Sequence, residues 1–204
     1  LGGFQVDQFT GSSVMSYPID VPPGRGGLQP AINLIYNSSN RNGWLGMGWD
    51  LNLGYIQRST KKGVPKYDST DEFVFVGPTG SIELVSIGNG EYRAKTEQAF
   101  MKFSTDGNNW YAWDKNGTSY RFEMRDSWSS GIFRWSLTSI TDVHNNNMSI
   151  GYYVNPQPEG SDHGYYAVPY SILYNRTESN ETLITFDVDY SRSDELETTD
   201  ISSG

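Results

Sequence analysis

The chain has 204 residues, 36% of them hydrophobic, so it is long enough to bury a core, and one domain is the default expectation. Its formal net charge of −9 makes nucleic acid and anionic membranes poor partners, because an acidic surface repels phosphate. Cysteine is absent, which excludes disulfides, thiolate nucleophiles and Cys-ligated zinc. The sequence contains no run of 18 apolar residues, so we expect no membrane insertion by this chain. It also does not begin with the basic and then apolar pattern of a signal peptide.

Alternating apolar and polar residues predict strands along the whole chain. In order, these patterns fall at residues 15–21, 32–36, 73–76, 82–85, 110–113, 133–138, 150–154 and 184–190. Turn-forming Gly, Pro, Asn and Asp residues separate them, and Asn116-Gly117 predicts a type I′ hairpin turn. No segment has a sustained helical stripe. The sequence therefore predicts an all-β fold of twisted antiparallel sheets built from successive short hairpins, arranged as a sandwich or as a segment of a shell.

The pattern predicts a single β-domain over residues 1–193. Residues 155–163 form a polar loop rich in Pro and Gly, with no second core beyond it. Residues 194–204 are acidic and rich in Ser and Thr, which predicts a disordered tail.

A dense pattern of glycine, proline and aromatic residues lies between residues 21 and 58. The glycines predict tight turns and close backbone approach, and the tryptophans predict anchors packed on a sheet. A single Arg-Gly-Gly in an acidic chain is weak support for RNA binding, and the glycine loop lacks the lysine and helix of a phosphate site. The residues that we assign to this structural motif are Pro22, Pro23, Gly24, Arg25, Gly26, Gly27, Trp44, Gly46, Gly48 and Trp49.

This opening motif resembles the N-terminal domain shared by SpvB-type virulence proteins and the B components of bacterial insecticidal Tc toxins. Later segments are similar to the family in the same order: residues 67–73 with 80–85, residues 114–120, and residues 135–142 with 150–153. The third of these also resembles an element of Rhs/YD-repeat shells, with Asn145-Asn146 in place of the usual Gly-Asn. The resemblance implies one end of a hollow β-shell that encloses an unfolded toxin segment. It brings no catalytic residues, since the enzymatic activity of SpvB-type proteins lies in a separate C-terminal domain.

The residues give no defensible active site or metal site. His144 and His163 are the only histidines, and neither has a Ser/His/Asp spacing. We expect Asp162 and the adjacent His163 to be solvated. Asp187 and Asp189 are expected on the solvent-exposed face of one strand. We therefore expect no enzyme, no cofactor and no bound metal.

The main alternative from a different class is carbohydrate binding. Aromatic residues flanked by Asn and Asp gather around one predicted hairpin, and flat rings of this kind stack on the C–H faces of sugars. The candidate residues are Trp110, Tyr111, Trp113, Tyr120 and Trp128. In an extended strand Trp110 and Trp113 face opposite sides, so at least one of them is expected in the core.

The sequence therefore favours a non-catalytic structural or shell module of a larger secreted bacterial toxin or Rhs-like protein, supporting encapsulation or delivery of a toxic C-terminal region. The expected partners are neighbouring domains of the same polypeptide or toxin-complex subunits, and polysaccharide under the alternative. The expected location is extracellular or on the bacterial surface.

Overall fold

The computed structural model describes residues 3–6, 13–38, 42–43, 45–78, 80–96, 100–155, 166–177 and 181–186. Within these ranges the chain consists of antiparallel strands joined by turns, and no α-helix occurs. The one helical turn in the described part is a short 3-10 turn, η1 (Arg25–Gly27). The predicted all-β fold is confirmed.

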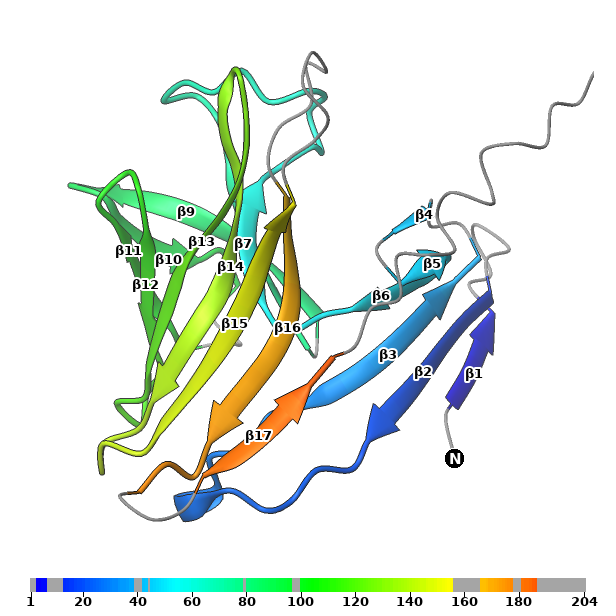
Figure 1. Cartoon of the computed structure of the whole chain (residues 1–204). Helices are drawn as coiled ribbons and strands as arrows, with labels where there is room; N and C mark the ends of the chain where they lie inside the picture. The colour runs from blue at the N-terminus through cyan, green and yellow to red at the C-terminus, as the bar shows by residue number, and fades with distance from the viewer. Residues whose placement is uncertain are drawn as a thin grey trace, which may run out of the picture.

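Eight consecutive strands close into a barrel, on the left of Figure 1. They are β7 (Tyr55–Arg58), β8 (Phe73–Gly77), β9 (Gly80–Gly88), β10 (Glu91–Ala94), β11 (Lys102–Thr105), β12 (Trp110–Trp113), β13 (Ser119–Trp128) and β14 (Gly131–Thr141). Each strand pairs with the next, and β14 pairs with both β13 and β7. The ring of strands therefore has no free edge, which protects it from pairing with other chains.

Aromatic side chains fill the barrel. Phe103 and Phe122 are fully buried, and the ring of Phe75 lies 5.5 Å and 5.9 Å from theirs. A second group surrounds Trp110, whose ring lies 4.8 Å from Tyr92 and 6.1 Å from Trp135. An eight-stranded barrel has an interior just wide enough for side chains to fill, so this one is a packed core and not a channel.

Three further strands extend the barrel wall into an open sheet. These are β15 (Asn147–Asn155), β16 (Tyr166–Tyr174) and β17 (Thr182–Thr185), which follow β14 in that order. In Figure 1 this extension runs from yellow to orange across the front of the molecule. Within the described residues β17 pairs with β16 alone, so it is the outer strand of the open sheet.

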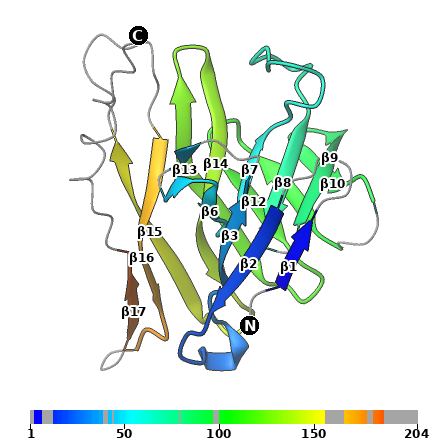
Figure 2. The ribbon, with the colours of Figure 1, turned by 90° about the vertical axis from the view of Figure 1, so that its right-hand side faces the viewer.

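A separate four-stranded sheet comes from the N-terminal part of the chain. It contains β1 (Gly3–Val6), β2 (Ser13–Ile19), β3 (Ile32–Asn37) and β6 (Trp49–Leu51), while β4 (Asn42–Gly43) and β5 (Gly46–Met47) pair with each other. Figure 2 shows this sheet in front of the barrel, with β15–β17 to its side. Pro18 pairs with Asn33 of β3 and lies beyond the segment of β2 that pairs with β1, as the expected irregularity at a proline requires.

One continuous core joins the two sheets. Ile32 and Leu51 of the four-stranded sheet belong to the same buried cluster as Ile150 and Ile172 of the open sheet. The connection from β6 to β7 is also fixed, because Asn52 donates its Nδ2 to the Gly77 carbonyl at 2.8 Å. The predicted single domain over residues 1–193 stays a prediction, and the predicted tail at 194–204 lies outside the described residues.

The turn between β12 and β13 differs from the expected type I′ hairpin. Trp113 pairs with Ser119, so five residues form the loop, and only Gly117 (φ +84°) among them has a positive φ. The Asp114 carboxylate explains the difference, because its Oδ1 accepts the backbone N–H groups of Asn116 and Thr118. An Asp at the start of a loop thus replaces the two-residue turn that Asn-Gly alone predicts.

Candidate functional site

The Pro-Pro-Gly-Arg-Gly-Gly motif forms a clamp between the two sheets, which we define as residues 22–27 together with Tyr174 and Asn175. Asn175, just after β16, has φ +58° and accepts the Arg25 backbone N–H at Oδ1 (2.7 Å). Its Nδ2 donates to the Pro23 carbonyl (3.1 Å), while the Tyr174 hydroxyl donates to the Pro22 carbonyl (2.6 Å). Because residues 22–25 lead into β3, these bonds tie the four-stranded sheet to the end of the open sheet.

Two glycines of the clamp stand where a side chain would collide. A Cβ on Gly24 would lie 1.8 Å from the carbonyl oxygen of Leu28, although the backbone of Gly24 is ordinarily extended. Gly26 has φ +62°, and a Cβ there would lie 3.1 Å from Asn146 Nδ2 and 3.3 Å from Asp142 Oδ2. Gly24 therefore meets the backbone of its own turn, and Gly26 packs the clamp against side chains of the turn between β14 and β15.

The second half of the motif lies at the far end of the same sheet. Gly48 has φ +81°, and a Cβ there would lie 2.6 Å from the ring of Tyr36. Tyr36 in turn packs against Trp49, with ring centroids 5.3 Å apart. Trp49 is thus half-buried beside a glycine, as predicted for an anchor on a sheet, whereas Trp44 lies outside the described residues.

The aromatic residues proposed for glycan binding are divided between the barrel interior and its surface. Trp110 is 1% exposed and points into the barrel, where it has no surface for a sugar. Trp113, three residues on, is 38% exposed on the outer face, which follows from the strand period of two. Tyr111 lies beside Trp113 with near-parallel rings, 6.5 Å apart at an angle of 28°.

The other two candidates do not join this pair. Tyr120 is half-buried and donates its hydroxyl to Asp114 Oδ2 at 3.2 Å. Burial, assisted by that carboxylate, raises the pKa of Tyr120 to about 12. Trp128 is 41% exposed but stands nine residues along β13 from Ser119, the partner of Trp113, which is roughly 30 Å at the usual strand rise.

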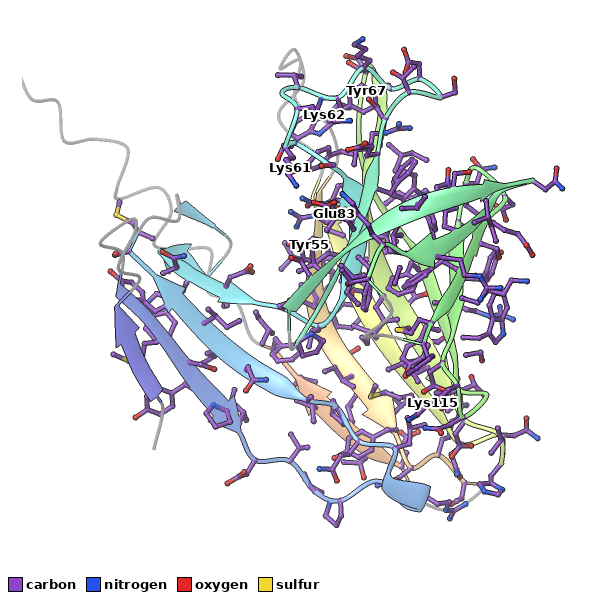
Figure 3. All side chains as sticks on the ribbon, turned by 180° about the vertical axis from the view of Figure 1, so that it is seen from behind. Tyr55, Lys61, Lys62, Tyr67, Glu83 and Lys115 are labelled. Carbon is purple, nitrogen blue, oxygen red and sulfur yellow. The ribbon has the colours of Figure 1, made fainter. Side chains whose placement is uncertain are left out.

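The loop at residues 59–72 extends beyond one end of the barrel. The ion pair of Arg58 with Asp71, which we call the latch, joins the two ends of this loop. Figure 3 labels Lys61, Lys62 and Tyr67 on this loop, with Lys115 at the opposite end of the barrel. Arg58 binds Asp71 at 2.8 Å and donates its Nε to the Ile132 carbonyl. Burial opposes the charge of Asp71, but backbone N–H donors from Lys66 and Tyr67, together with Arg58, lower its pKa overall.

Around Arg58 a cleft of about 690 Å³ is lined by loop residues 67–72 and by residues of the barrel end, among them the aromatic residues Phe73, Tyr92, Trp110 and Trp135. The Arg58 guanidinium lies 5.3 Å from the ring centroid of Phe73 and 5.1 Å from that of Tyr67. The Arg58 guanidinium is thus already engaged by cation–π contacts and by the ion pair with Asp71. We therefore interpret this cleft as a structural contact between the loop and the barrel, and not as a ligand site.

The described residues hold no group of three or more His, Asp or Glu side chains arranged to bind a metal ion. Nor does any helix in the described part have the length and apolarity of a membrane span. His144 lies in the turn after β14, where its backbone N–H binds Asp142. His163, Asp162, Asp187 and Asp189 lie outside the described residues.

Comparison with known proteins locates the sequence relationship in the first half of the chain. Residues 7–103 match the family described as SpvB: Salmonella virulence plasmid 65kDa B protein. The mono(ADP-ribosyl)transferase SpvB of Salmonella choleraesuis (strain SC-B67) is 36% identical over 81 residues, which is 40% of this chain and 13% of that protein. The resemblance to SpvB-type proteins is confirmed. This chain spans only about an eighth of the curated relatives, so their activity as whole proteins does not transfer with the match.

Solved structures extend the likeness across most of the fold. The crystal structure of TcdB2–TccC3 matches with a TM-score of 0.69 and 24% identity, over 89% of this chain and 10% of that one. The N-terminal domain of effector protein SpvB from Salmonella typhimurium strain LT2 matches with a TM-score of 0.60 and 22% identity, over 78% of this chain and 63% of that one. The fold is therefore shared by an SpvB domain and by a toxin component, as the sequence predicted.

Sequence reasoning missed the residues that complete these sites. Asn175 carries no local signal for its role in the clamp, which depends on a contact across 150 residues. Arg58 and Asp71 carry no local signal for their pairing. The positive φ of Asn145 (+61°) was predictable, because Asn replaces a glycine there in the family pattern.

Proposed function

We propose that this chain is a non-catalytic structural module of a larger secreted bacterial toxin or Rhs-like protein. It would form part of a β-walled shell that supports encapsulation or delivery of a toxic C-terminal region. The observation that carries the proposal is the fold shared with TcdB2–TccC3 over 89% of the chain. The partners would be neighbouring domains of the same polypeptide or subunits of a toxin complex, outside the bacterial cell or at its surface.

The packing of the molecule supports a role as a wall. The barrel interior is filled with side chains, so the barrel itself would not enclose cargo. It would instead be a rigid, packed part of the wall. The open sheet and the four-stranded sheet, in contrast, each have an outer strand that pairs on one side only within the described residues. Such edges are suited to continuation by strands from a neighbouring domain.

The non-catalytic part of the proposal has a direct test. The chain, expressed alone, should transfer no label from labelled NAD to proteins of a eukaryotic cell extract, whereas a full-length SpvB-type transferase serves as the positive control. Labelled protein that depends on this chain would contradict the non-catalytic part of the proposal.

The encapsulation part needs the full-length parent protein. Asn175→Ala removes the bonds of the clamp to Pro23 and Arg25, while Asn147→Ala removes two exposed hydrogen bonds between β14 and β15, to Ile140 and Thr141, outside the clamp. If the module is part of the shell wall, the clamp variant should make the C-terminal region of the parent more sensitive to added protease, and the Asn147 variant should not. Equal protease sensitivity of both variants and the wild type would count against a wall role.

Glycan binding remains a second candidate function because one observation favours it. Trp113 and Tyr111 expose near-parallel rings on the outer face of the barrel, although apolar side chains of this size are usually buried. Polysaccharide pull-down with wild type and Trp113→Ala tests this candidate. Equal binding by the two proteins would exclude Trp113 as part of a glycan site.

A further inference from the structure

A groove of about 460 Å³ lies on the outer face of barrel strands β10, β11 and β12. Its floor is a row of directly paired residues, in which Arg93 stands opposite Lys102 and Lys102 opposite Trp113. Neighbouring strands are about 4.8 Å apart, so Arg93 and Trp113 lie roughly 10 Å apart on the same face, with Lys102 between them. Both the volume and the span fit a single sugar residue with its flanking linkages.

Two exposed aromatic side chains line this groove. Phe100 is 71% exposed and Trp113 is 38% exposed. The Trp113 ring is held in place by Tyr111, whose own hydroxyl donates to Asp106 Oδ2 at 3.2 Å. A ring fixed before binding loses little freedom on contact with a ligand, which favours stacking against a sugar face.

The charges of the groove point to an anionic ligand. Asp114 carries a negative charge, but the loop holds its carboxylate in place, since Oδ1 accepts two backbone N–H groups and Oδ2 accepts the Tyr120 hydroxyl. Lys102 is paired with Glu91. Arg93 is exposed and forms no ion pair with any described residue, although its charge adds to that of Lys102 in lowering the pKa of nearby Glu91. A guanidinium in this position can receive a carboxylate through two parallel N–H donors.

We propose that this groove binds a uronic-acid residue of an acidic polysaccharide. The sugar ring stacks on Trp113, Phe100 contacts its edge, and its carboxylate pairs with Arg93. This inference rests on the second candidate function, glycan binding at the exposed aromatic residues, and adds to it the class of sugar and the residue that selects it. It is independent of the role as a shell module.

The test uses two probes with the same sugar backbone, polygalacturonate and its methyl ester, in which a methyl group replaces the negative charge of the carboxylate. Binding to the intact chain is followed by isothermal titration calorimetry and tryptophan fluorescence at about 0.05 M and about 0.3 M salt. We expect the wild type to bind the acid about tenfold more tightly than the ester, and to lose this preference at the higher salt concentration.

Three variants locate the site. Arg93→Gln should weaken binding of the acid about tenfold and leave binding of the ester unchanged, since it removes only the partner of the carboxylate. Trp113→Ala should weaken binding of both probes. Trp128→Ala, a similarly exposed tryptophan at the far end of β13, should change neither. Far-ultraviolet circular dichroism of each variant checks that the β-fold is retained.

Each other outcome overturns a defined part of the proposal. Equal affinity for acid and ester, lost in Trp113→Ala, would refute the acidic ligand and leave glycan binding in place. Absence of binding to both probes would refute this inference and would remove its support from the second candidate function, while the shell proposal would stand. An equal loss in Trp113→Ala and Trp128→Ala would refute the assignment to this groove.

Discussion

Gly24 and Asn175 show how single residues hold the clamp together. Position 24 requires glycine for steric reasons, because a Cβ there would overlap the carbonyl of Leu28. The backbone angle does not require it, since φ is −87°, which any residue can adopt. Asn175 is required by its chemistry, because an amide supplies both the acceptor for Arg25 and the donor to Pro23. The clamp therefore depends on two residue types that no other side chain reproduces.

Gly24→Ala should destabilise the fold by about 2 kcal/mol or more, because the added methyl group overpacks a turn that has no room to move. Gly27→Ala is the matched control. It has open space around the Cβ but φ +81°, so only the backbone cost of about 1 kcal/mol applies. Urea unfolding measures both, and a control that is destabilised more than Gly24→Ala would contradict the steric explanation.

Trp135→Ala should cost about 3–5 kcal/mol, as expected for removal of a large aromatic side chain from a packed core. Trp135 is 2% exposed and also donates its Nε1 to the Asn108 carbonyl at 2.9 Å. Trp128→Ala, on the surface of the same barrel, should change the free energy of unfolding by less than about 1 kcal/mol. Similar losses in the two variants would mean that the barrel is not packed as described.

At the scale of elements, the loop at residues 59–72 is held by its two ends. Arg58 and Asp71 pair across the base, and Ser59 donates its backbone N–H to the Glu72 carbonyl at 2.7 Å. Surface ion pairs contribute little by comparison, although Lys61 and Lys95 lower the pKa of the exposed Glu83 to about 2. The loop is therefore fixed by the latch at its base and not by the lysines along its length.

Asp71→Asn should lower stability by about 2 kcal/mol near neutral pH, because the partly buried guanidinium of Arg58 loses its charged partner. The folded-state pKa of Asp71 is lowered, so its contribution is present above the unfolded pKa of about 4 and is lost as the pH falls through the folded value. The difference between wild type and variant should therefore shrink below about pH 4.

The control for this prediction is Glu83→Gln, measured by urea unfolding with and without about 0.5 M salt. Salt should abolish any effect of the exposed Glu83 ion pairs, whereas the effect of Asp71 should persist, since its side chain is 8% exposed. A wild-type advantage over Asp71→Asn that is independent of pH would show that the charge of Asp71 is not what stabilises the latch.

At the scale of the whole molecule, local pattern predicted the hairpins but not the way they close. The pairs β8–β9 and β12–β13 follow from alternation and turn residues that lie next to each other in sequence. The barrel closes because residues 55–57 of β7 pair with residues 134–136 of β14, and nothing in either segment marks so distant a partner. For the same reason, the exposed groove could not be foreseen: Trp113 was a visible candidate, but Arg93 reaches it through the pairing of β10, β11 and β12.

The outer strand β17 leads to a prediction about association. Its sequence, Thr-Leu-Ile-Thr, carries no charge or proline, and Leu183 is 57% exposed. Uncharged edges of this kind recruit other strands. The chain should therefore self-associate weakly, and Leu183→Lys should reduce this association in sedimentation velocity experiments over a range of concentrations. Sedimentation as a monomer at every concentration would contradict an open edge at β17.

The position of β14 also determines how the molecule responds to mechanical load. Among the described strands β14 alone pairs with three others, β7, β13 and β15, so tension applied along the open sheet reaches the barrel through it. A pull from residue 186 would peel β17 from β16 and then β16 from β15, one pair of hydrogen bonds at a time. The closed ring offers no strand that can be peeled in this way. Under mechanical load the strands of the open sheet would therefore detach first, one after another. The barrel would remain folded after this partial unfolding.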